Sequence, residues 1–331
     1  MNLTTGIGYE TAKNIVSMGG TVVLACRFID KAQLAREEIV RTTNCRKENV
    51  IVLKLDLSLL SSVRQFADDF RALKLPLHAL INNAGVMMSS RQLTPDGFEK
   101  DFMVNYLGHF LLTNLLLPEL ELTNGRVVNV SSSMHKLKTR FEFDNVMAEK
   151  SFSLFGTYAQ SKLAMILFTG ELQRRLEYII CDIVLLYLVY CITGDLFNVE
   201  NLMTKLFEYV IENDKIDKEY CYCRLCAKGS RITCNTMHPG CVHTEITRDL
   251  HIVVRVANAL CPPCFVPLRK TAAEGAYTST HLATAAGLEG KGGQYYFHCK
   301  PVPPGPCVVD DVASEKLWKM SETLAGIVMP N

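Results

Sequence analysis

The chain has 331 residues, of which 48% are hydrophobic and 21% are charged, and its net charge is +1. This is the composition of a globular protein, and the near-neutral balance argues against a nucleic-acid partner. Thirteen cysteines at irregular spacing argue against a disulfide framework, and no residues at ligand spacing predict a metal site. We expect no signal peptide, because residues 1–5 have neither a basic start nor an apolar run.

Short apolar segments alternate with helix-length amphipathic segments along the chain. The predicted strands are residues 21–26, 50–55, 77–81, 126–130, 232–237 and 294–297. The predicted helices are residues 9–18, 31–41, 61–73, 98–117 and 158–176. Strands of about five residues separated by helices indicate an α/β fold with a doubly wound parallel sheet. A ligand is expected at the carboxyl ends of such strands.

This alternation breaks in two places. The chain opens on the turn Gly6-Ile7-Gly8 directly before a helix, so we expect the first strand of the sheet to be missing. Residues 178–228 interrupt a connection that is normally a handful of residues, and we expect them outside the main core. Their apolar run, residues 178–192, is shorter than the roughly 20 residues of a membrane span. A missed first exon and a retained intron would explain both breaks; an acquired membrane anchor is the alternative for the insert.

Tyr158 and Lys162 lie four residues apart in a predicted helix, and therefore on one helical face. A phenol with a pKa of about 10 is a poor acid–base catalyst at neutral pH, and a nearby ammonium group lowers that pKa. The tyrosine could then exchange a proton with an alcohol or a carbonyl while a hydride moves. A solvated helix face explains an isolated pair equally well.

Three further segments support the catalytic interpretation. The strand 126–130 ends in Ser131-Ser132-Ser133, where a hydroxyl can bind a substrate oxygen or form a turn. The segment Asn82-Asn83-Ala84-Gly85 follows another strand, and its small residues either admit a cofactor or form a plain turn. Asn105 lies in an apolar helix near Gly108, which predicts a local distortion there; a satisfied core asparagine is the alternative.

Together these segments resemble the short-chain dehydrogenase/reductase family in its single-domain form. The segment Asn82-Asn83-Ala84-Gly85 is followed by Asn105, Ser132, Tyr158 and Lys162, in order and at family spacing. Residues 238–244 match the family segment Pro-Gly-x-x-x-Thr, which lies against the nicotinamide and the phosphates. The resemblance implies a Rossmann-type fold over residues 1–325, interrupted by residues 178–228, and an oxidoreductase activity that depends on NAD or NADP.

The resemblance also implies a catalytic tetrad of Asn105, Ser132, Tyr158 and Lys162. Tyr158 would be the acid/base, and Ser132 would orient the substrate oxygen. Lys162 would lower the pKa of Tyr158 and hold the cofactor ribose, and Asn105 would anchor a water that relays protons. Ser132 is chosen because the family's catalytic serine is the second after the strand.

The cofactor-binding residues implied by the resemblance come from several segments. Gly6 and Gly8 match the last two glycines of the fingerprint Thr-Gly-x-x-x-Gly-x-Gly, whose helix amides face the pyrophosphate. Met1 and Asn2 stand where the family has the threonine and the first glycine, so this cradle is incomplete. Asp56 matches the residue that contacts adenine. The full predicted set is Gly6, Ile7, Gly8, Arg27, Asp56, Leu57, Asn83, Ala84, Gly85, Tyr158, Lys162, Pro239, Gly240, Val242 and Thr244.

The choice between NAD and NADP depends on the end of the strand 21–26. An NAD site places an acidic residue there, on the ribose 2′-hydroxyl. Here the strand is followed by Arg27, with no carboxylate before Asp30. An arginine can pair with a 2′-phosphate, so NADP is expected, with a solvated charge as the alternative role of Arg27.

Residues 96–99, 105–113 and 160–164 resemble the retinol-dehydrogenase-like branch of the family, and residues 289–318 resemble a branch member encoded on chromosome X. This implies a lipophilic retinoid-, isoprenoid- or polyprenol-like substrate and peripheral association with a membrane. The apolar residues 252–268 form either a slot for that substrate or a lid with its own core.

We expect a cytoplasmic location for the chain as it stands, and the endoplasmic reticulum membrane if a missing N-terminal segment is restored. The rival interpretations of function are a truncated family member without catalysis and a mis-spliced product that binds no cofactor.

Overall fold

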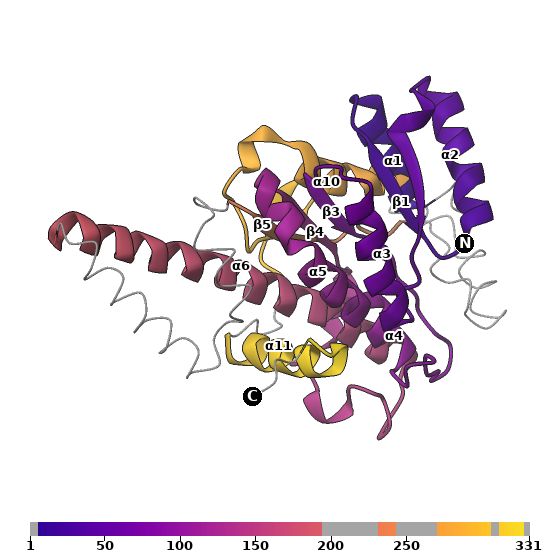
Figure 1. Cartoon of the computed structure of the whole chain (residues 1–331). Helices are drawn as coiled ribbons and strands as arrows, with labels where there is room; N and C mark the ends of the chain where they lie inside the picture. Colours follow the sequence, from indigo (N-terminus) through magenta and orange to yellow (C-terminus); the bar gives the residue numbers. More distant parts are fainter. Residues whose placement is uncertain (1–5, 194–230, 243–269, 306–310, 328–331) are drawn as a thin grey trace.

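The computed structural model describes residues 6–193, 231–242, 270–305 and 311–327, and of residues 178–193 the backbone alone (Figure 1). The strands are β1 (Val22–Cys26), β2 (Val50–Lys54), β3 (Ala79–Asn82), β4 (Arg126–Val130), β5 (Thr233–Met237), β6 (Tyr295–Phe297) and β7 (Lys300–Pro301). The helices are α1 (Ile7–Ser17), α2 (Ile29–Thr43), α3 (Leu60–Ala72), α4 (Lys100–Phe102), α5 (Gly108–Thr123), α6 (Leu154–Thr193), α10 (Ala272–Thr284) and α11 (Asp311–Ala325). A π-helical turn spans Met103–Leu107, and short 3-10 turns span Lys47–Asn49, Ser133–Leu137, Phe143–Asn145 and Ala286–Leu288.

The strands form two hydrogen-bonded groups. β1 pairs with β2, and the larger group has the order β3-β4-β5-β6-β7. Every neighbouring pair is parallel except β6 and β7. Parallel strands joined by helices confirm the predicted doubly wound α/β fold. α1 is the first element of the described residues, and residues 1–5, where the chain opens, lie outside them.

The alternating residues of β4 show that the sheet is buried on both faces. Val127 belongs to the largest apolar cluster, which it shares with side chains of α3, α5, α6 and α11. Val128 and Val130 face the other side and pack against Leu282 of α10. Because successive side chains of a strand point to opposite faces, helices must cover both faces of β4.

Helix α6 runs further than the sequence predicts. We expected it to end near residue 176, but it continues to Thr193 and projects beyond the sheet and the other helices (Figure 1). The sequence from residue 178 onward contains no glycine or proline until Gly194, so it carries no signal that ends a helix. The predicted insert therefore begins as an extension of α6, outside the main core, and its residues 194–228 lie outside the described residues.

Helix α11, absent from the sequence-based prediction, closes the face formed by α5 and α6 (Figure 1). Trp318 is buried and packs edge-on against Phe110 of α5, with ring centroids 5.0 Å apart. The guanidinium of Arg175 lies 4.4 Å from the centre of the Trp318 ring. Among the described residues, no helix is both long enough and apolar enough to cross a membrane.

Candidate active site

The carboxyl ends of β3, β4 and β5 bring three of the predicted site segments to one edge of the sheet. The strands are adjacent and parallel, so the residues that follow them emerge side by side. Ala84 and Gly85 follow β3, Ser132 follows β4, and Pro239 follows β5. Residues brought together in this way share a site although they are far apart in the sequence.

The three serines after β4 have different partners. Ser131 Oγ donates a hydrogen bond to the carbonyl oxygen of Lys162, at 2.7 Å. The side chain of Ser132 is hydrogen-bonded to the hydroxyl of Tyr158, and it also accepts a bond from the Met134 amide, at 3.2 Å. Ser133 is exposed. The structure thus places the predicted serine, and not its neighbours, beside the tyrosine.

Tyr158 lies in the first turns of α6 and is buried, with 5% of its surface exposed. Burial raises the pKa of Tyr158 above its ordinary value, the bond from Ser132 lowers it, and the nearby Asp101 raises it. The Lys162 Nζ atom lies 5.9 Å from the centre of the tyrosine ring. Desolvation of the phenolate dominates here, so the hydroxyl carries its proton at neutral pH.

Lys162 is one turn further along α6 and is also buried. Its Nζ atom donates a hydrogen bond to the carbonyl oxygen of Val130, at 2.9 Å. Burial lowers the pKa of Lys162 to about 8, against the opposing influence of Asp101. Gly85 leaves room for this ammonium group, because a Cβ atom at residue 85 would lie only 3.3 Å from Nζ.

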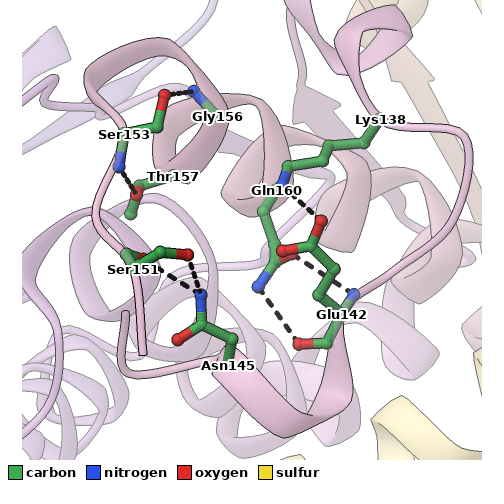
Figure 2. A network of polar contacts seen from close by, with 8 residues as sticks. All are labelled: Lys138, Glu142, Asn145, Ser151, Ser153, Gly156, Thr157 and Gln160. Atoms are coloured by element: carbon green, nitrogen blue, oxygen red, sulfur yellow. Dashed lines mark hydrogen bonds and ion pairs between the residues drawn. The ribbon is translucent and has the colours of Figure 1, made fainter. Parts of the chain in front are cut away.

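A hydrogen-bonded turn fixes the start of the helix that carries Tyr158 (Figure 2). The Ser153 amide donates to Thr157 Oγ1, and the Gly156 amide donates to Ser153 Oγ, at 3.4 and 3.3 Å. These side-chain oxygens and the amides around them satisfy groups that a helix leaves free in its first turn. The position of Tyr158 along the helix axis is therefore set locally.

A second set of contacts in Figure 2 ties the same helix to the segment before it. The Gln160 side chain accepts a bond from the Glu142 amide and donates one to the Glu142 carbonyl oxygen, at 3.3 and 3.4 Å. The Glu142 carboxylate forms a salt bridge with the Lys138 ammonium, at 2.7 Å. This clamp lies two residues beyond Tyr158 and restricts rotation of α6.

Asn105 lies in the π-helical turn, which confirms the local distortion predicted for this residue. Its Oδ1 atom accepts from the Val86 amide at 2.7 Å, and its Nδ2 atom donates to the Val86 carbonyl oxygen and to Ser161 Oγ, both at 2.9 Å. Both amide hydrogens of Asn105 are thus used inside the protein. A π turn widens the helix by one residue and so re-aims this side chain.

The predicted phosphate cradle lies at the N-terminus of α1. Gly6 is the N-cap, its backbone is extended, and a Cβ atom there would meet no atom of the described residues within 4 Å. At Gly8 a Cβ atom would lie 2.6 Å from Nδ2 of Asn83, so glycine lets α1 approach the loop after β3. The amides at a helix N-terminus point outward, and such an end suits a pyrophosphate.

Ile7 and Val242, two further residues of the predicted cofactor site, both lie against Gly275 of α10. A Cβ atom at Gly275 would lie 2.8 Å from the Val242 side chain and 3.2 Å from that of Ile7. Gly240, between Pro239 and Val242, has a φ of +89°, a backbone conformation that favours glycine. The predicted cofactor residues of α1, β3 and β5 therefore meet, and they fit a nicotinamide dinucleotide. Thr244 and the predicted apolar slot at residues 252–268 lie outside the described residues.

The residues expected around the adenosine lie at the ends of β1 and β2. Arg27 is exposed, and its guanidinium lies 4.5 Å from the centre of the Phe28 ring, on which the Lys31 ammonium also lies, at 5.4 Å. Asp56 Oδ1 accepts bonds from the amide and the hydroxyl of Ser58, at 3.0 and 2.6 Å. Leu57 is buried. The two cations around one ring form a positively charged site after β1.

The sequence-based prediction did not include Asp101 and His109, which lie on either side of the π turn that carries Asn105. Asp101 and His109 are fully buried polar side chains on the helix that carries Asn105. Burial lowers the pKa of His109 to about 4 and raises that of Asp101 to about 8. The available signal was the spacing of Asp101, Asn105 and His109, four residues apart on one face of an apolar helix.

Comparison with known proteins gives one family. The sequence model described as short chain dehydrogenase matches residues 3–190. Human retinol dehydrogenase 12 is 37% identical over 98% of this chain and 84% of its own length, and mouse retinol dehydrogenase 11 is 38% identical with the same coverage. Human polyprenol dehydrogenase is 34% identical over 98% of this chain and 83% of its own length.

Solved structures agree with this result. An uncharacterised protein from Mycobacterium paratuberculosis superposes with a TM-score of 0.63 at 29% identity, covering 100% of this chain and 93% of that one. A short-chain type dehydrogenase/reductase from Mycobacterium marinum has a TM-score of 0.58 at 16% identity, covering 88% and 89%, and supports the fold alone.

Proposed function

Because the chain belongs to the short-chain dehydrogenase/reductase family of oxidoreductases, we propose that it interconverts an alcohol and an aldehyde or ketone, with NADP as the cofactor. The observation that carries this proposal is the hydrogen bond between Tyr158 and Ser132 at the carboxyl end of β4. Lys162 follows one helical turn later on the same face of α6. Asn105, Ser132, Tyr158 and Lys162 form the proposed tetrad.

In the direction of reduction, Tyr158 acts as the acid. When bound, the reduced nicotinamide would supply a hydride for the carbonyl carbon. The Tyr158 hydroxyl gives its proton to the carbonyl oxygen, which completes the alcohol and leaves Tyr158 as the phenolate. Ser132 holds the same oxygen through its hydroxyl. The raised pKa of Tyr158 keeps this proton in place at neutral pH, so the site holds the acid form that the reduction requires.

Lys162 is proposed to hold the cofactor ribose, and Asn105 to anchor a water. With one N–H of Lys162 on the Val130 carbonyl oxygen, the ammonium group keeps two further N–H donors for the ribose hydroxyls. Asn105 retains one acceptor site on Oδ1, which suits the anchoring of a water in a proton relay.

NADP is proposed over NAD on the basis of charge after β1. Arg27 and Lys31 lie around the Phe28 ring, at the place where a dinucleotide fold binds the adenosine ribose. A guanidinium there can donate two parallel hydrogen bonds to a 2′-phosphate, which a ribose hydroxyl cannot accept in the same way. Asp56 is proposed to contact the adenine.

A lipophilic alcohol or aldehyde is the proposed substrate. The relatives named above are dehydrogenases of retinol and of polyprenol, both long apolar alcohols. The catalytic tyrosine shares its apolar cluster with Met87, Met134 and Leu154, which give the site an apolar wall. Such a wall favours a substrate whose carbonyl group is attached to a hydrocarbon chain.

The proposed function is tested by Tyr158→Phe in the full chain. NADPH oxidation is measured with all-trans-retinal and a polyprenal as substrates and propanal as the polar control, and NADPH affinity is measured separately by fluorescence. We expect kcat to fall by about 100-fold or more, since a positioned acid contributes about 10²–10⁴-fold, with NADPH affinity unchanged. Propanal should be the poorest substrate of the unsubstituted protein.

The matched control is Tyr106→Phe. Tyr106 is also buried, but its hydroxyl is bonded to Ser321 of α11, at 2.7 Å. This variant loses a structural hydrogen bond and should keep its turnover. Retention of more than about a tenth of the activity in Tyr158→Phe would show that Tyr158 is not the acid.

A further inference from the structure

Three buried side chains hold the loop after β3 from one side. Asp101, Asn105 and His109 follow one another at intervals of four residues, from α4 through the π turn into α5. Each of them has at most 3% of its surface exposed. Each forms hydrogen bonds to the backbone of residues 84–88, which we call the 84–88 loop.

The bonds fall on alternate residues of this loop. His109 Nε2 lies 3.0 Å from the Ala84 carbonyl oxygen and, being neutral, donates to it. Asn105 binds both the amide and the carbonyl of Val86. Asp101 Oδ1 accepts a bond from the Met88 amide, at 3.1 Å. The three side chains thus bind residues 84, 86 and 88 in order.

The residues between these positions contact the catalytic pair. Gly85 approaches the Lys162 ammonium, because a Cβ atom there would lie 3.3 Å from Nζ. Met87 packs against the Tyr158 ring. The loop is therefore held at residues 84, 86 and 88 and presents residues 85 and 87 to the proposed acid and its lysine.

We propose that Asp101 is a positioning residue, which holds Met87 against the Tyr158 ring through its hydrogen bond to the Met88 amide. The catalytic part of this inference rests on the proposed function, in which Tyr158 is the acid. Among the described residues, Asp101 is the side chain of this set that binds the far end of the 84–88 loop, beyond Met87. Without it, Asn105 and His109 hold only the part of the loop that precedes Met87.

The environment of Asp101 suits an uncharged acceptor. Its second oxygen, Oδ2, is buried and has no hydrogen-bond partner among the described residues. The charged groups that act on it are Glu99, Lys100 and Lys162, and burial is the largest influence on its pKa, which is raised to about 8. A protonated carboxyl still accepts a bond from the Met88 amide. An asparagine at residue 101 should therefore preserve this hydrogen bond, whereas a leucine should remove it.

The first experiment measures hydrogen exchange of the Met88 amide in the full chain and needs no enzymatic activity. Asp101→Leu removes the acceptor at similar volume, and we expect exchange of the Met88 amide to become about tenfold faster. Asp101→Asn keeps an amide oxygen at the same place and should exchange as the unsubstituted protein does. Glu99→Gln is the matched control, since Glu99 is also a buried carboxyl but binds the Phe102 amide instead.

The second experiment measures NADPH-dependent reduction of all-trans-retinal. Asp101→Leu should lower kcat about tenfold or more and leave KM within about twofold, because a displaced acid slows the chemical step. Asp101→Asn should restore kcat, which a loss of general stability would not predict. Met87→Ala keeps the hydrogen bond at Met88 and removes the contact with Tyr158, so it should lower kcat while exchange of the Met88 amide stays slow.

The outcomes separate this inference from the proposed function. Unchanged exchange of the Met88 amide in Asp101→Leu, or full kcat in Met87→Ala, would overturn the positioning role. An Asp101→Asn variant as impaired as Asp101→Leu would overturn it as well. If the unsubstituted protein reduced no aldehyde, the proposed function would fail, and the exchange comparison would still decide whether Asp101 holds the loop. Should Asp101→Leu not fold, Asp101→Asn and Met87→Ala carry the test.

Discussion

Burial sets the protonation state of the residues that matter most in this protein. Burial keeps a proton on Tyr158, lowers the pKa of Lys162 to about 8, and holds His109 neutral. These shifts have one cause, because a buried group is most stable in its uncharged form. Desolvation is the largest influence on the pKa values of both Tyr158 and Lys162.

Arg27→Asp tests the cofactor preference. The change removes the proposed partner of the 2′-phosphate and supplies an acceptor for a ribose hydroxyl. We expect NADPH to bind at least about tenfold more weakly and NADH more tightly, which reverses the preference. Dissociation constants for both cofactors check this, with Arg46→Asp as an exposed control outside the proposed site. Equal affinity of the unsubstituted protein for the two cofactors would contradict the assignment.

His109→Gln tests the neutral buried histidine through stability. The folded protein holds the pKa of His109 at about 4, whereas the unfolded chain has a histidine pKa of about 6.5. As the pH falls from about 6.5 to about 4, the unfolded chain takes up a proton that the folded protein does not, so stability decreases. Glutamine keeps a donor for the Ala84 carbonyl and does not titrate.

The measurement is the melting temperature of both proteins between pH 7.5 and pH 4.5. The unsubstituted protein should lose about 3 °C or more relative to His109→Gln over this range. His238, whose pKa burial also lowers to about 4, is present in both proteins and cancels in the difference. Parallel curves would mean that the folded protein and the unfolded chain protonate His109 equally readily, so that its pKa is not lowered on folding.

At the scale of elements, glycines decide how closely the helices approach the loops that form the site. The π turn aims Asn105 at the 84–88 loop, and Gly108 directly after it lets α5 touch the loop before α3. A Cβ atom at residue 108 would lie 2.8 Å from the Leu57 carbonyl oxygen, a backbone atom that cannot move aside alone. Close approach at this point brings the helix that carries Asn105 into place.

Gly108→Ala should therefore destabilise the protein, although alanine is the better helix former. We expect a loss of about 1–3 kcal/mol in the free energy of unfolding, typical of overpacking. The matched control is Gly170→Ala in α6, where a Cβ atom would meet nothing within 4 Å. There the gain in helix propensity should stabilise by about 0.5–1 kcal/mol. Urea unfolding of the two variants checks the opposite signs.

At the scale of the whole molecule, the chain separates into a core that carries the site and an extension of α6 that does not. The described residues of the proposed tetrad and cofactor site all lie outside residues 178–228. In Figure 1 the end of α6 projects away from the sheet and from the helices that cover it. Activity should therefore be independent of this extension.

Deletion of residues 178–228 tests this separation. Joining Glu177 to Gly229 leaves a connection of ordinary length for an α/β unit and lowers the entropic cost of closing the loop. We expect a higher melting temperature and unchanged NADPH affinity and kcat. The control is the same deletion combined with Tyr158→Phe, which should fold equally well and remain inactive. Loss of folding on deletion would show that the segment is part of the native core.

The sequence alone determined the class of fold, the order of its main elements and the candidates for the tetrad. Strand and helix periodicities are local properties, so β1 to β6 appear near their predicted residues, and the distortion at Asn105 was visible as a polar residue in an apolar run. The sequence also indicated the family, because its motifs stand in order. It did not predict α10 and α11. These helices are stabilised by packing against other elements, as Trp318 of α11 packs against Phe110 of α5, and such packing is not visible in the local sequence.

Only the tertiary structure decided which of the candidates meet and in what ionisation state. Ser132 was separated from its two neighbours by its hydrogen bond to the Tyr158 hydroxyl, and the rise in the pKa of Tyr158 came from its burial among distant segments. The hydrogen bonds of Asp101 and His109 to the 84–88 loop join residues whose pairing no local pattern encodes. Distance between side chains and exclusion of water are properties of the packed molecule, and they decide the chemistry of the site.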